Sequence, residues 1–402
     1  MIAGRPRERT GPEIGRATNG SEPGNVILAT HYWSPGWASA LDDYLIPRAR
    51  KYRWIGHPLF ADGSPSTFRE YSDGELVKSV DVAGARGPLR HLEDLLRTLR
   101  WARHEEPADL FIAGDNLLAL AGIWMRWRRR VRAVVLYTID FVPQRFKNPL
   151  ANRIYHSIDR FAAGRSDVVW NTAKGVIAAR AVRDQGRKLA PHIVVPIGAY
   201  THRTGAPADG SRRRTIAYLG HLLEKQGLQV VISALPEVRQ RFPDARLLVI
   251  GDGPYRPALE RLARDVRVSD AVEFAGFSDD HVAIERRLLE CTIGVAPYVP
   301  DQENYSRFQD LPGKIINYLA CGLAVITSEV PGDGRLIVEA GAGRVVDYTP
   351  ASFAAAINDY FQYPALLDSA SPAAVKLGAA YDWTEIFDRA FSETHALLQV
   401  GH

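Results

Sequence analysis

The sequence has little cysteine, no long hydrophobic run and no strong excess of either charge. Its two cysteines, Cys291 and Cys321, lie in apolar stretches, which excludes a secreted disulfide framework and is typical of a reducing cytoplasm. The longest apolar run, residues 117–125, is shorter than the roughly 18 residues of a membrane-spanning helix. With 50 Lys and Arg against 46 Asp and Glu, the net charge of +4 is spread too thinly to indicate nucleic-acid binding. We therefore expect a soluble cytoplasmic protein.

What the chain does contain is a recurring pattern of short apolar runs, each followed by a polar loop and a helical segment. Such runs predict strands, and their alternation with helices of about 10–15 residues predicts parallel, doubly wound sheets of the Rossmann type. The predicted strands lie at residues 26–30, 110–113, 134–137, 167–170 and 193–196, and again at 215–219, 246–250, 272–274, 292–295 and 324–327. The chain therefore reads as two α/β domains in tandem.

Composition changes along the chain place the domain boundaries. Residues 1–24 are polar and lack the apolar stretch of a signal peptide, so we interpret them as a flexible arm. An N-terminal domain at 25–200 precedes a linker at 201–214, where Gly, Pro and three consecutive Arg interrupt the apolar pattern. The C-terminal domain covers 215–378, and a terminal helix covers 379–402.

Glycines follow three strands of the C-terminal domain. Gly220, Gly251, Gly253 and Gly276 each stand where a strand gives way to a loop. In open parallel sheets ligands bind at these strand ends, and glycine lets the backbone approach a phosphate closely. One such glycine usually makes a turn, but the set in one domain favours nucleotide binding over purely structural turns.

A second binding signal lies in the segment 298–327. A helix is predicted from Gly313 to Ala320, with Asp310 and Pro312 as its start signals. Lys314 falls in the first turn, where the helix dipole disfavours a cation unless an anion is bound there. We therefore assign Lys314 to a diphosphate, and the alternative is a solvated surface lysine.

Several segments resemble the GT-B glycosyltransferases in the expected order. LPGKIINYLACGLAVITS (311–328) resembles their donor-binding helix, and YLGHLLEKQGLQVVISAL (218–235) resembles the first strand and phosphate loop of their C-terminal domain. LLVIGDGPYRPALERL (247–262) and VEFAGFSDD (272–280) match two further landmarks, and residues 381–387 resemble the terminal helix that crosses back onto the N-terminal domain. The resemblance implies two Rossmann-like domains facing a cleft, with the acceptor bound by the first domain and the nucleotide sugar by the second.

Within this family the donor helix is most similar to the inverting glucuronosyltransferase of xanthan assembly. The spacing of Asp310, Lys314 and Asn317 carries this similarity, whereas the large retaining branch has a second Glu where Asn317 stands and an Arg where His221 stands. The resemblance implies a UDP-sugar as co-substrate. The donor-binding residues expected on these grounds are Gly220, His221, Lys225, Gly251, Gly253, Phe277, Tyr298, Asp310, Gly313, Lys314 and Asn317.

Two residues are candidates for the general base that takes the proton of an acceptor hydroxyl. Asp140 ends a strand in LYTIDF, and the resemblance places the catalytic carboxylate there; its alternative role is to cap the following loop. His31 follows the first strand, and Asp115 could orient it as a His–Asp dyad. We take Asp140 as the base and inversion as the mechanism, while retention with Asp310 in an acidic role stays open.

No metal or further cofactor is expected. The sequence has no Asp-x-Asp signature at a strand end, and its histidines lack ligand spacing. Lys314, His221 and Lys225 would then stabilise the departing diphosphate electrostatically.

A cluster of five Arg and two Trp stands apart from these motifs, at Trp124 to Arg132. It predicts either peripheral contact with an anionic membrane, at the inner face, or a helix whose apolar side (Leu117, Leu120, Trp124) is core. The acceptor, whether a glycan, a lipid-linked sugar or a small molecule, is not encoded in any motif.

Two other functions share the architecture. A nucleotide-sugar 2-epimerase would need no second substrate, and a non-catalytic module would bind nucleotide sugar without turnover. Asn317 stands in place of the second Glu and His221 in place of the Arg, and these replacements keep the non-catalytic module open.

Overall fold

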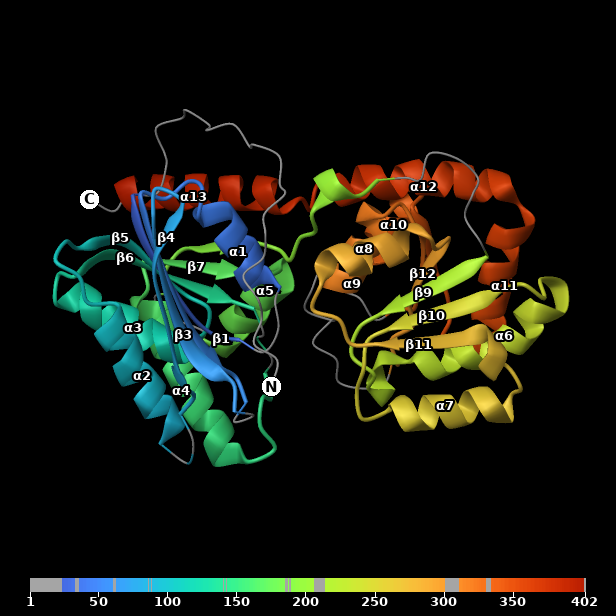
Figure 1. Cartoon of the computed structure of the whole chain (residues 1–402), viewed down its shortest axis with the longest axis horizontal. Helices are drawn as coiled ribbons and strands as arrows, with labels where there is room; N and C mark the ends of the chain where they lie inside the picture. Colours follow the sequence, from blue (N-terminus) through green and yellow to red (C-terminus); the bar gives the residue numbers. More distant parts are fainter. Residues whose placement is uncertain are drawn as a thin grey trace.

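The computed structural model describes residues 24–32, 36–60, 63–85, 87, 89–139, 141, 143–184, 187, 189–205, 214–300, 311–329 and 334–400. These residues form two α/β domains that stand side by side along the long axis of the molecule (Figure 1). The prediction of two Rossmann-like domains in tandem is confirmed. Most of the arm at 1–24 and most of the linker, at 206–213, lie outside the described residues.

The N-terminal domain is built on an eight-stranded sheet in the order β4-β3-β2-β1-β5-β6-β7-β8. Its core lies on both faces of this sheet, where the apolar strand residues are covered by helices. The elements are β1 (Asn25–Tyr32), α1 (Trp37–Leu45), β2 (Lys51–Pro58), β3 (Pro65–Ser72), β4 (Glu75–Ala83), α2 (Arg90–Trp101), β5 (Ala108–Ala113), α3 (Asn116–Trp127), β6 (Val131–Thr138), α4 (Pro149–Arg165), β7 (Val168–Asn171), α5 (Lys174–Arg183) and β8 (His192–Val194).

One edge of this sheet differs from the wholly parallel sheet that the sequence predicts. Strands β3 and β4 pair antiparallel, with β3 next to β2. The turn between them holds Asp73 at φ 50° and Gly74 at φ 88°, the paired left-handed conformation of a tight hairpin. Asp–Gly is a usual signal for such a turn. Almost all residues of β4 are exposed, so this strand has no long apolar run by which the sequence could predict it.

The C-terminal domain has a six-stranded, wholly parallel sheet in the order β11-β10-β9-β12-β13-β14. Its elements are β9 (Thr215–Leu219), η2 (Glu224–Gln226), α6 (Leu228–Arg241), β10 (Arg246–Ile250), α7 (Arg256–Asp265), η3 (Ser269–Ala271), β11 (Val272–Gly276), α8 (His281–Leu289), β12 (Ile293–Ala296), α9 (Gly313–Ala320), β13 (Ala324–Thr327), α10 (Gly334–Glu339), β14 (Gly343–Val345) and α11 (Pro350–Gln362).

Each sheet has a point at which its strand order reverses, and ligands bind outside the carboxyl ends of the strands at such points. In the N-terminal domain this point lies between β1 and β5, and in the C-terminal domain between β9 and β12. The side chains that follow β1, β5, β9 and β12 therefore define where a site can form.

Two helices at the end of the chain tie the domains together. Helix α12 (Pro364–Ala379) packs on α9, whereas α13 (Trp383–Val400) runs along the N-terminal domain (Figure 1). Phe387 and Phe391 of α13 enter the same core as Tyr44, whose hydroxyl donates to Asp388 at 2.7 Å. The expected return of the terminal helix to the N-terminal domain is confirmed. The short helix η1 (Thr201–Arg203) adjoins this crossing, where Asp382 accepts hydrogen bonds from Thr201.

Candidate functional site

The glycine loops of the C-terminal domain are bonded to one another at the carboxyl edge of its sheet. The Gly220 amide donates to the Ile250 carbonyl at 2.9 Å, and the Gly251 amide donates to the Gly276 carbonyl at 2.8 Å. A Cβ on Gly251 would lie 1.9 Å from the Gly220 carbonyl oxygen, and one on Gly253 would lie 2.4 Å from the Leu222 oxygen. Larger residues therefore do not fit here. These glycines let three loops pack against one another.

Lys314 lies beside this group of loops, in the first turn of α9. Its ammonium donates to Gln226 Oε1 at 2.7 Å and to the Tyr218 hydroxyl at 3.4 Å, and it faces the rings of Tyr218 and Tyr298 at 4.5 and 4.9 Å. A Cβ on Gly220 would lie 3.2 Å from Lys314 Cε. Glycine at position 220 thus leaves room for the lysine at the switch point between β9 and β12.

The charge of Lys314 is poorly compensated. Burial lowers the pKa of its ammonium from 10.5 to about 7, and no acidic side chain of the described residues raises the pKa again. A neutral amide and two aromatic rings attract a cation more weakly than a carboxylate does. The helix N-terminus adds unpaired amide groups and a positive dipole end at the same place. This combination favours an anion near Lys314.

The other expected donor residues fall into three groups. Asn317 donates to the Gly313 carbonyl at 2.7 Å within α9. Tyr298 is 1% exposed, and its buried ring contacts the Lys314 ammonium at 4.9 Å. His221 is exposed and Lys225 is half-buried on the loop that leads to η2. Phe277 is 59% exposed after β11, where an aromatic face is accessible to a base. Asp310 lies outside the described residues.

Tyr318 supports this site from within α9, and it is not among the residues that the sequence motifs predict. Strands β9 and β12 pair only near Gly294, where a Cβ would lie 2.3 Å from the Tyr318 ring. Beyond that point the Tyr318 hydroxyl accepts from the Leu219 amide at 2.6 Å and donates to the Val295 carbonyl at 3.2 Å. Its buried side chain thus fixes α9, and with it Lys314, against both strands. A Tyr four residues after a first-turn Lys, on the same helix face, is the available signal.

In the N-terminal domain the expected dyad is present at the switch point between β1 and β5. His31 Nδ1 lies 2.8 Å from Asp115 Oδ2, and the same oxygen accepts from the His31 amide at 3.1 Å. The other oxygen, Asp115 Oδ1, caps α3 by accepting from the amides of Leu117 and Leu118. Asp115 is therefore fixed by the helix that it starts, and it fixes the ring of His31 in turn.

The surroundings of His31 bear on its suitability as a base. Burial by itself lowers the pKa of His31, but the carboxylates of Asp115 and Asp94 outweigh it and raise the pKa to about 9. The pKa of Asp115 is lowered to about 2, because the gain from the His31 ring and backbone amides exceeds the cost of burial. An imidazole that already carries a proton at neutral pH must release it before it can accept one from a hydroxyl, so Asp140 stays the predicted general base.

Three partners of this dyad come from other elements, and no sequence motif predicts them. Asp94 Oδ2 lies 3.4 Å from His31 Nε2, and the rings of His57 and His91 each lie 5.6 Å from the His31 ring. Ligand atoms of His31, His91 and Asp94 lie within 4.8 Å of one another, close enough for a metal ion. His31 precedes His91 and Asp94 by about sixty positions, so no motif of fixed spacing predicts that the three residues meet.

Asp140, the expected base, lies outside the described residues, but its two neighbours do not. Phe141 is 2% exposed, with the guanidinium groups of Arg180 and Arg183 at 5.0 and 5.2 Å from its ring. The Thr172 hydroxyl donates to the Ile139 carbonyl at 3.4 Å. The chain on either side of position 140 is therefore held by fixed contacts.

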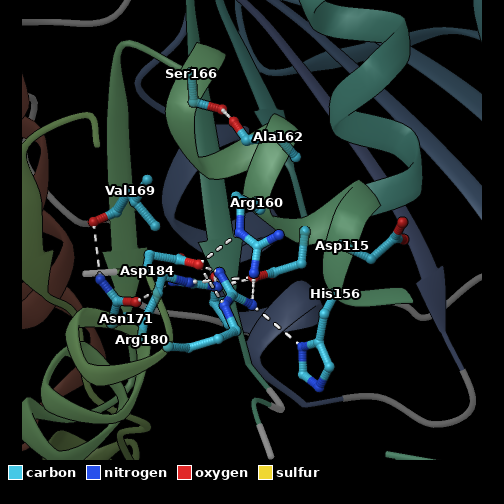
Figure 2. A network of polar contacts seen from close by, with 12 residues as sticks. Asp115, His156, Arg160, Ala162, Ser166, Val169, Asn171, Arg180 and Asp184 are labelled. Carbon is cyan, nitrogen blue, oxygen red and sulfur yellow. Dashed lines mark hydrogen bonds and ion pairs between the residues drawn. The ribbon is translucent and has the colours of Figure 1, made fainter. Parts of the chain in front are cut away.

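A buried polar network surrounds these contacts. Arg180 is fully buried and donates to Asp159, to Asn171 Oδ1 at 2.8 Å and to the Thr138 hydroxyl at 3.1 Å (Figure 2). Arg160 and Arg183 both bind Asp184 in the same network. Removal of one partner from such a network leaves a buried charge unpaired, so we expect it to hold the end of β6 rigidly.

The prediction that Leu117, Leu120 and Trp124 form the buried side of the helix with the Arg/Trp cluster is wrong: Leu117 and Leu120 are half-buried and Trp124 is exposed. The buried face of α3 consists instead of Leu118, Ala119, Ala121, Gly122 and Met125. Gly122 decides this, because a Cβ there would lie 2.6 Å from the Phe111 ring in β5. Trp124 and Trp127 are 41% and 74% exposed. They border a hollow of about 510 Å³ lined by Leu120, Ile123, Trp124, Arg126, Trp127, Phe161 and Arg165.

No helix among the described residues combines the length and the hydrophobicity that crossing a bilayer requires.

Two family models match the chain. One, a glycosyl transferase 4-like domain, matches residues 56–198, and the other, glycosyl transferases group 1, matches residues 213–362. Among curated proteins, the chain is 39% identical over 139 residues to the GDP-mannose-dependent alpha-(1-6)-phosphatidylinositol monomannoside mannosyltransferase of Mycobacterium tuberculosis H37Rv, and 27% identical over 169 residues to the alpha-D-kanosaminyltransferase of Streptomyces kanamyceticus. These matches cover 34% and 42% of each chain in the pair. The chain thus spans well under half the length of these relatives.

Solved structures resemble the chain over almost its whole length. An Anabaena protein (Alr3699/HepE), solved in complex with UDP-glucose, is 17% identical with a TM-score of 0.67 and covers 92% of this chain and 99% of its own. A sucrose-phosphate synthase from Thermosynechococcus elongatus is also 17% identical with a TM-score of 0.67, over 93% and 99% of the two chains. At this identity the resemblance shows the fold alone, with both domains present.

Proposed function

The chain belongs to the GT-B glycosyltransferases of the group 1 and 4-like families, and we propose that it transfers a sugar from a nucleotide-diphosphate sugar to an acceptor hydroxyl. The observation that carries the proposal is Lys314, a poorly compensated cation at a helix N-terminus, at a sheet switch point and against Gly220. A diphosphate is the anion that such a position suits, because the lysine and the free helix amides would share its charge.

We propose GDP-mannose as the donor to test first and a UDP-sugar as the second. The relative with 39% identity over 139 residues is named as GDP-mannose-dependent, and this supports guanine. The similarity of Asp310, Lys314 and Asn317 to an inverting enzyme supports UDP instead. Phe277, exposed after β11, is the proposed stacking partner for the base in either case.

The proposed reaction is a single displacement with inversion. Asp140 takes the proton of the acceptor hydroxyl while that oxygen forms the new bond to the anomeric carbon. The bond from this carbon to the diphosphate breaks at the same time, and the diphosphate leaves with the electron pair. Lys314 and the amides at the start of α9 stabilise its charge, with no metal in the donor site.

Thermal stabilisation by free nucleotide diphosphates tests the donor site directly. GDP, UDP, CDP, ADP and TDP are compared with and without magnesium on the full chain. A diphosphate at about 100 times its Kd adds about 2.7 kcal/mol, which raises Tm by roughly 5–10 °C for domains of this size. We expect GDP to give the largest shift, independent of magnesium. A largest shift with UDP would assign the second donor, and no shift with any diphosphate would contradict the donor site.

We further propose that the acceptor is presented at a membrane surface. Helices α2, α3 and α4 lie on the same side of the N-terminal sheet, with α3 packed against both of the others (Figure 1). Large apolar side chains are exposed on or beside all three, namely Leu89, Leu92, Leu96, Trp124, Trp127, Phe146, Leu150, Ile154 and Phe161. Arginines 128 to 130, all exposed, follow α3 directly. Apolar side chains beside cations suit the interface of an anionic bilayer.

Sedimentation with lipid vesicles tests this surface. We expect binding to vesicles that contain phosphatidylglycerol and much weaker binding to pure phosphatidylcholine. The double variant Trp124→Ser and Trp127→Ser should bind at least roughly tenfold more weakly, since each loses an interfacial aromatic anchor. Tyr363→Ser is the matched control, because Tyr363 is 52% exposed in the other domain. Equal loss in the control and in the double variant would contradict the proposal.

A further inference from the structure

The group around His31 contains two buried polar atoms whose nearest charged partners lie at ion-pair distance, 3.4 Å, and that make no hydrogen bond among the described residues. Among the described residues, neither His31 Nε2 nor Asp94 Oδ1 has a hydrogen-bond partner, although the side chains of both residues are almost fully buried, at 7% and 3% exposure. A buried polar atom without a hydrogen bond costs about 1–3 kcal/mol, so two of them on neighbouring side chains call for an explanation. The proposed glycosyl transfer uses neither atom.

The arrangement of the ring and the carboxylate matches a pair of metal ligands. His31 Nε2 and Asp94 Oδ2 lie 3.4 Å apart, an ion-pair distance that is longer than an ordinary hydrogen bond. Two ligands bound at about 2.0–2.1 Å on a tetrahedral zinc ion are themselves about 3.3 Å apart. The third member, His91, offers a ring nitrogen within 4.8 Å of both atoms. Its side chain is exposed, so it can close this distance without repacking the core.

The neighbouring side chains prepare His31 to act as a ligand. Asp115 holds the Nδ1 side of the ring at 2.8 Å, which fixes the orientation of His31 and leaves Nε2 directed to Asp94. A carboxylate behind a metal-binding histidine has this role in many metal sites. His57 is not a ligand, because Ser66 and Thr98 occupy both of its ring nitrogens at 3.0 and 2.8 Å. It packs under the group as a neutral spacer, and burial is the main cause that lowers its pKa, to about 4.

Charge balance favours a divalent ion at this place. Asp94 and Asp115 bring two negative charges to the His31 ring at the carboxyl edge of the sheet, and one divalent cation that displaces the proton from His31 Nε2 would neutralise both. Two imidazoles and one carboxylate are borderline ligands that suit zinc and its first-row neighbours, whereas magnesium and calcium prefer sites made of oxygen.

We propose that His31, His91 and Asp94 bind one divalent transition-metal ion, with Zn²⁺ as the best match, at the switch point between β1 and β5. Asp115 is a positioning residue that acts through His31. Three protein ligands leave a coordination position for water. This site is separate from the donor site at Lys314 and is independent of the proposed glycosyl transfer.

Metal binding by the full chain tests the proposal. After EDTA treatment and dialysis, Zn²⁺ is titrated by calorimetry, and the visible absorption of bound Co²⁺ reports the ligand geometry. We expect about one equivalent per chain and a tetrahedral Co²⁺ spectrum. His91→Gln and Asp94→Asn should each weaken binding by at least roughly tenfold, and Asp115→Asn by roughly ten- to a hundredfold. His104→Gln is the matched control, because His104 faces Glu70 and lies outside the group.

The variants also separate this proposal from that of the donor site. His91 is exposed, so His91→Gln should fold normally even if Asp94→Asn does not, and circular dichroism checks both. The Tm shift that GDP gives should be the same in His91→Gln as in the unmodified chain. No bound Zn²⁺, or equal binding by His91→Gln and His104→Gln, would overturn the metal site without affecting the donor site. A lost GDP response with intact Zn²⁺ binding would do the reverse.

Discussion

Lys314→Met is expected to remove most nucleotide-diphosphate binding and at the same time to stabilise the fold. Methionine retains the length and packing of the lysine side chain but carries no charge. A charge-assisted hydrogen bond contributes roughly 1.5–3 kcal/mol, so the Kd for GDP should rise about ten- to a hundredfold. The effect on kcat/KM should be larger, about 10²–10³, because the charge on the diphosphate grows as it leaves.

The stability gain follows from the pKa of Lys314, which is about 7 in the folded chain against an ordinary value of 10.5. Below pH 7 the folded state must hold the buried charge at a cost, whereas the unfolded state carries the same proton without it. Between pH 7 and pH 10.5 the unfolded state binds more protons than the folded state, so the free energy of unfolding of the unmodified chain rises with pH in this range. Lys314→Met should therefore be more stable by about 1–2 kcal/mol below pH 7, because solvent at the partly exposed side chain screens part of the cost of the charge. The gain should shrink towards pH 10.

Urea unfolding at two pH values and calorimetric titration with GDP measure both effects. GDP binding favours the charged form of Lys314, so above pH 7 the binding reaction should take up a proton. The affinity for GDP should therefore fall as the pH rises. Lys376→Met on the exposed side of α12 is the matched control and should change neither quantity. A Lys314→Met variant that binds GDP as tightly as the unmodified chain would remove the basis of the proposed donor site.

Asp140→Asn is expected to abolish turnover while leaving donor binding intact. The amide cannot accept the acceptor proton, and loss of a general base typically lowers kcat by 10²–10⁴. Because Asp140 belongs to the other domain from Lys314, the Tm shift that GDP gives should not change. Retention of substrate binding with loss of kcat separates a catalytic defect from a folding defect.

The configuration of the product provides the second part of this test. Asp140 as base requires that the anomeric centre inverts, which NMR of the product reads directly. Asp310→Asn is the comparison variant, because retention would give Asp310 the acidic role. A product of retained configuration, together with a larger loss of kcat in Asp310→Asn than in Asp140→Asn, would exclude the inverting mechanism.

The cluster of glycine loops around Lys314 was predictable from the sequence because its parts are local. Each glycine follows its own strand, and Lys314 is recognisable from the start signals of its helix within a few residues. The strand order then brings these loops together, since the carboxyl ends of parallel strands share one edge. The sequence could not show that Tyr318 fills the gap between β9 and β12, because that contact depends on how far apart the strands lie.

The N-terminal domain required the tertiary structure. Apolar residues occur on all sides of α3, so their periodicity does not predict which face of the helix is buried. The close contact of Gly122 with Phe111 determines the buried face. His31 and Asp115 were paired correctly because both end neighbouring strands, but Asp94 and His91 come from a helix whose position no local pattern encodes. The sequence by itself determined that the chain forms two α/β domains, that glycine loops follow the strands of the second domain, and that Lys314 lies in the first turn of its helix, because these features depend on local patterns. The tertiary structure decided which distant polar side chains meet, because such contacts follow from packing across the whole sheet.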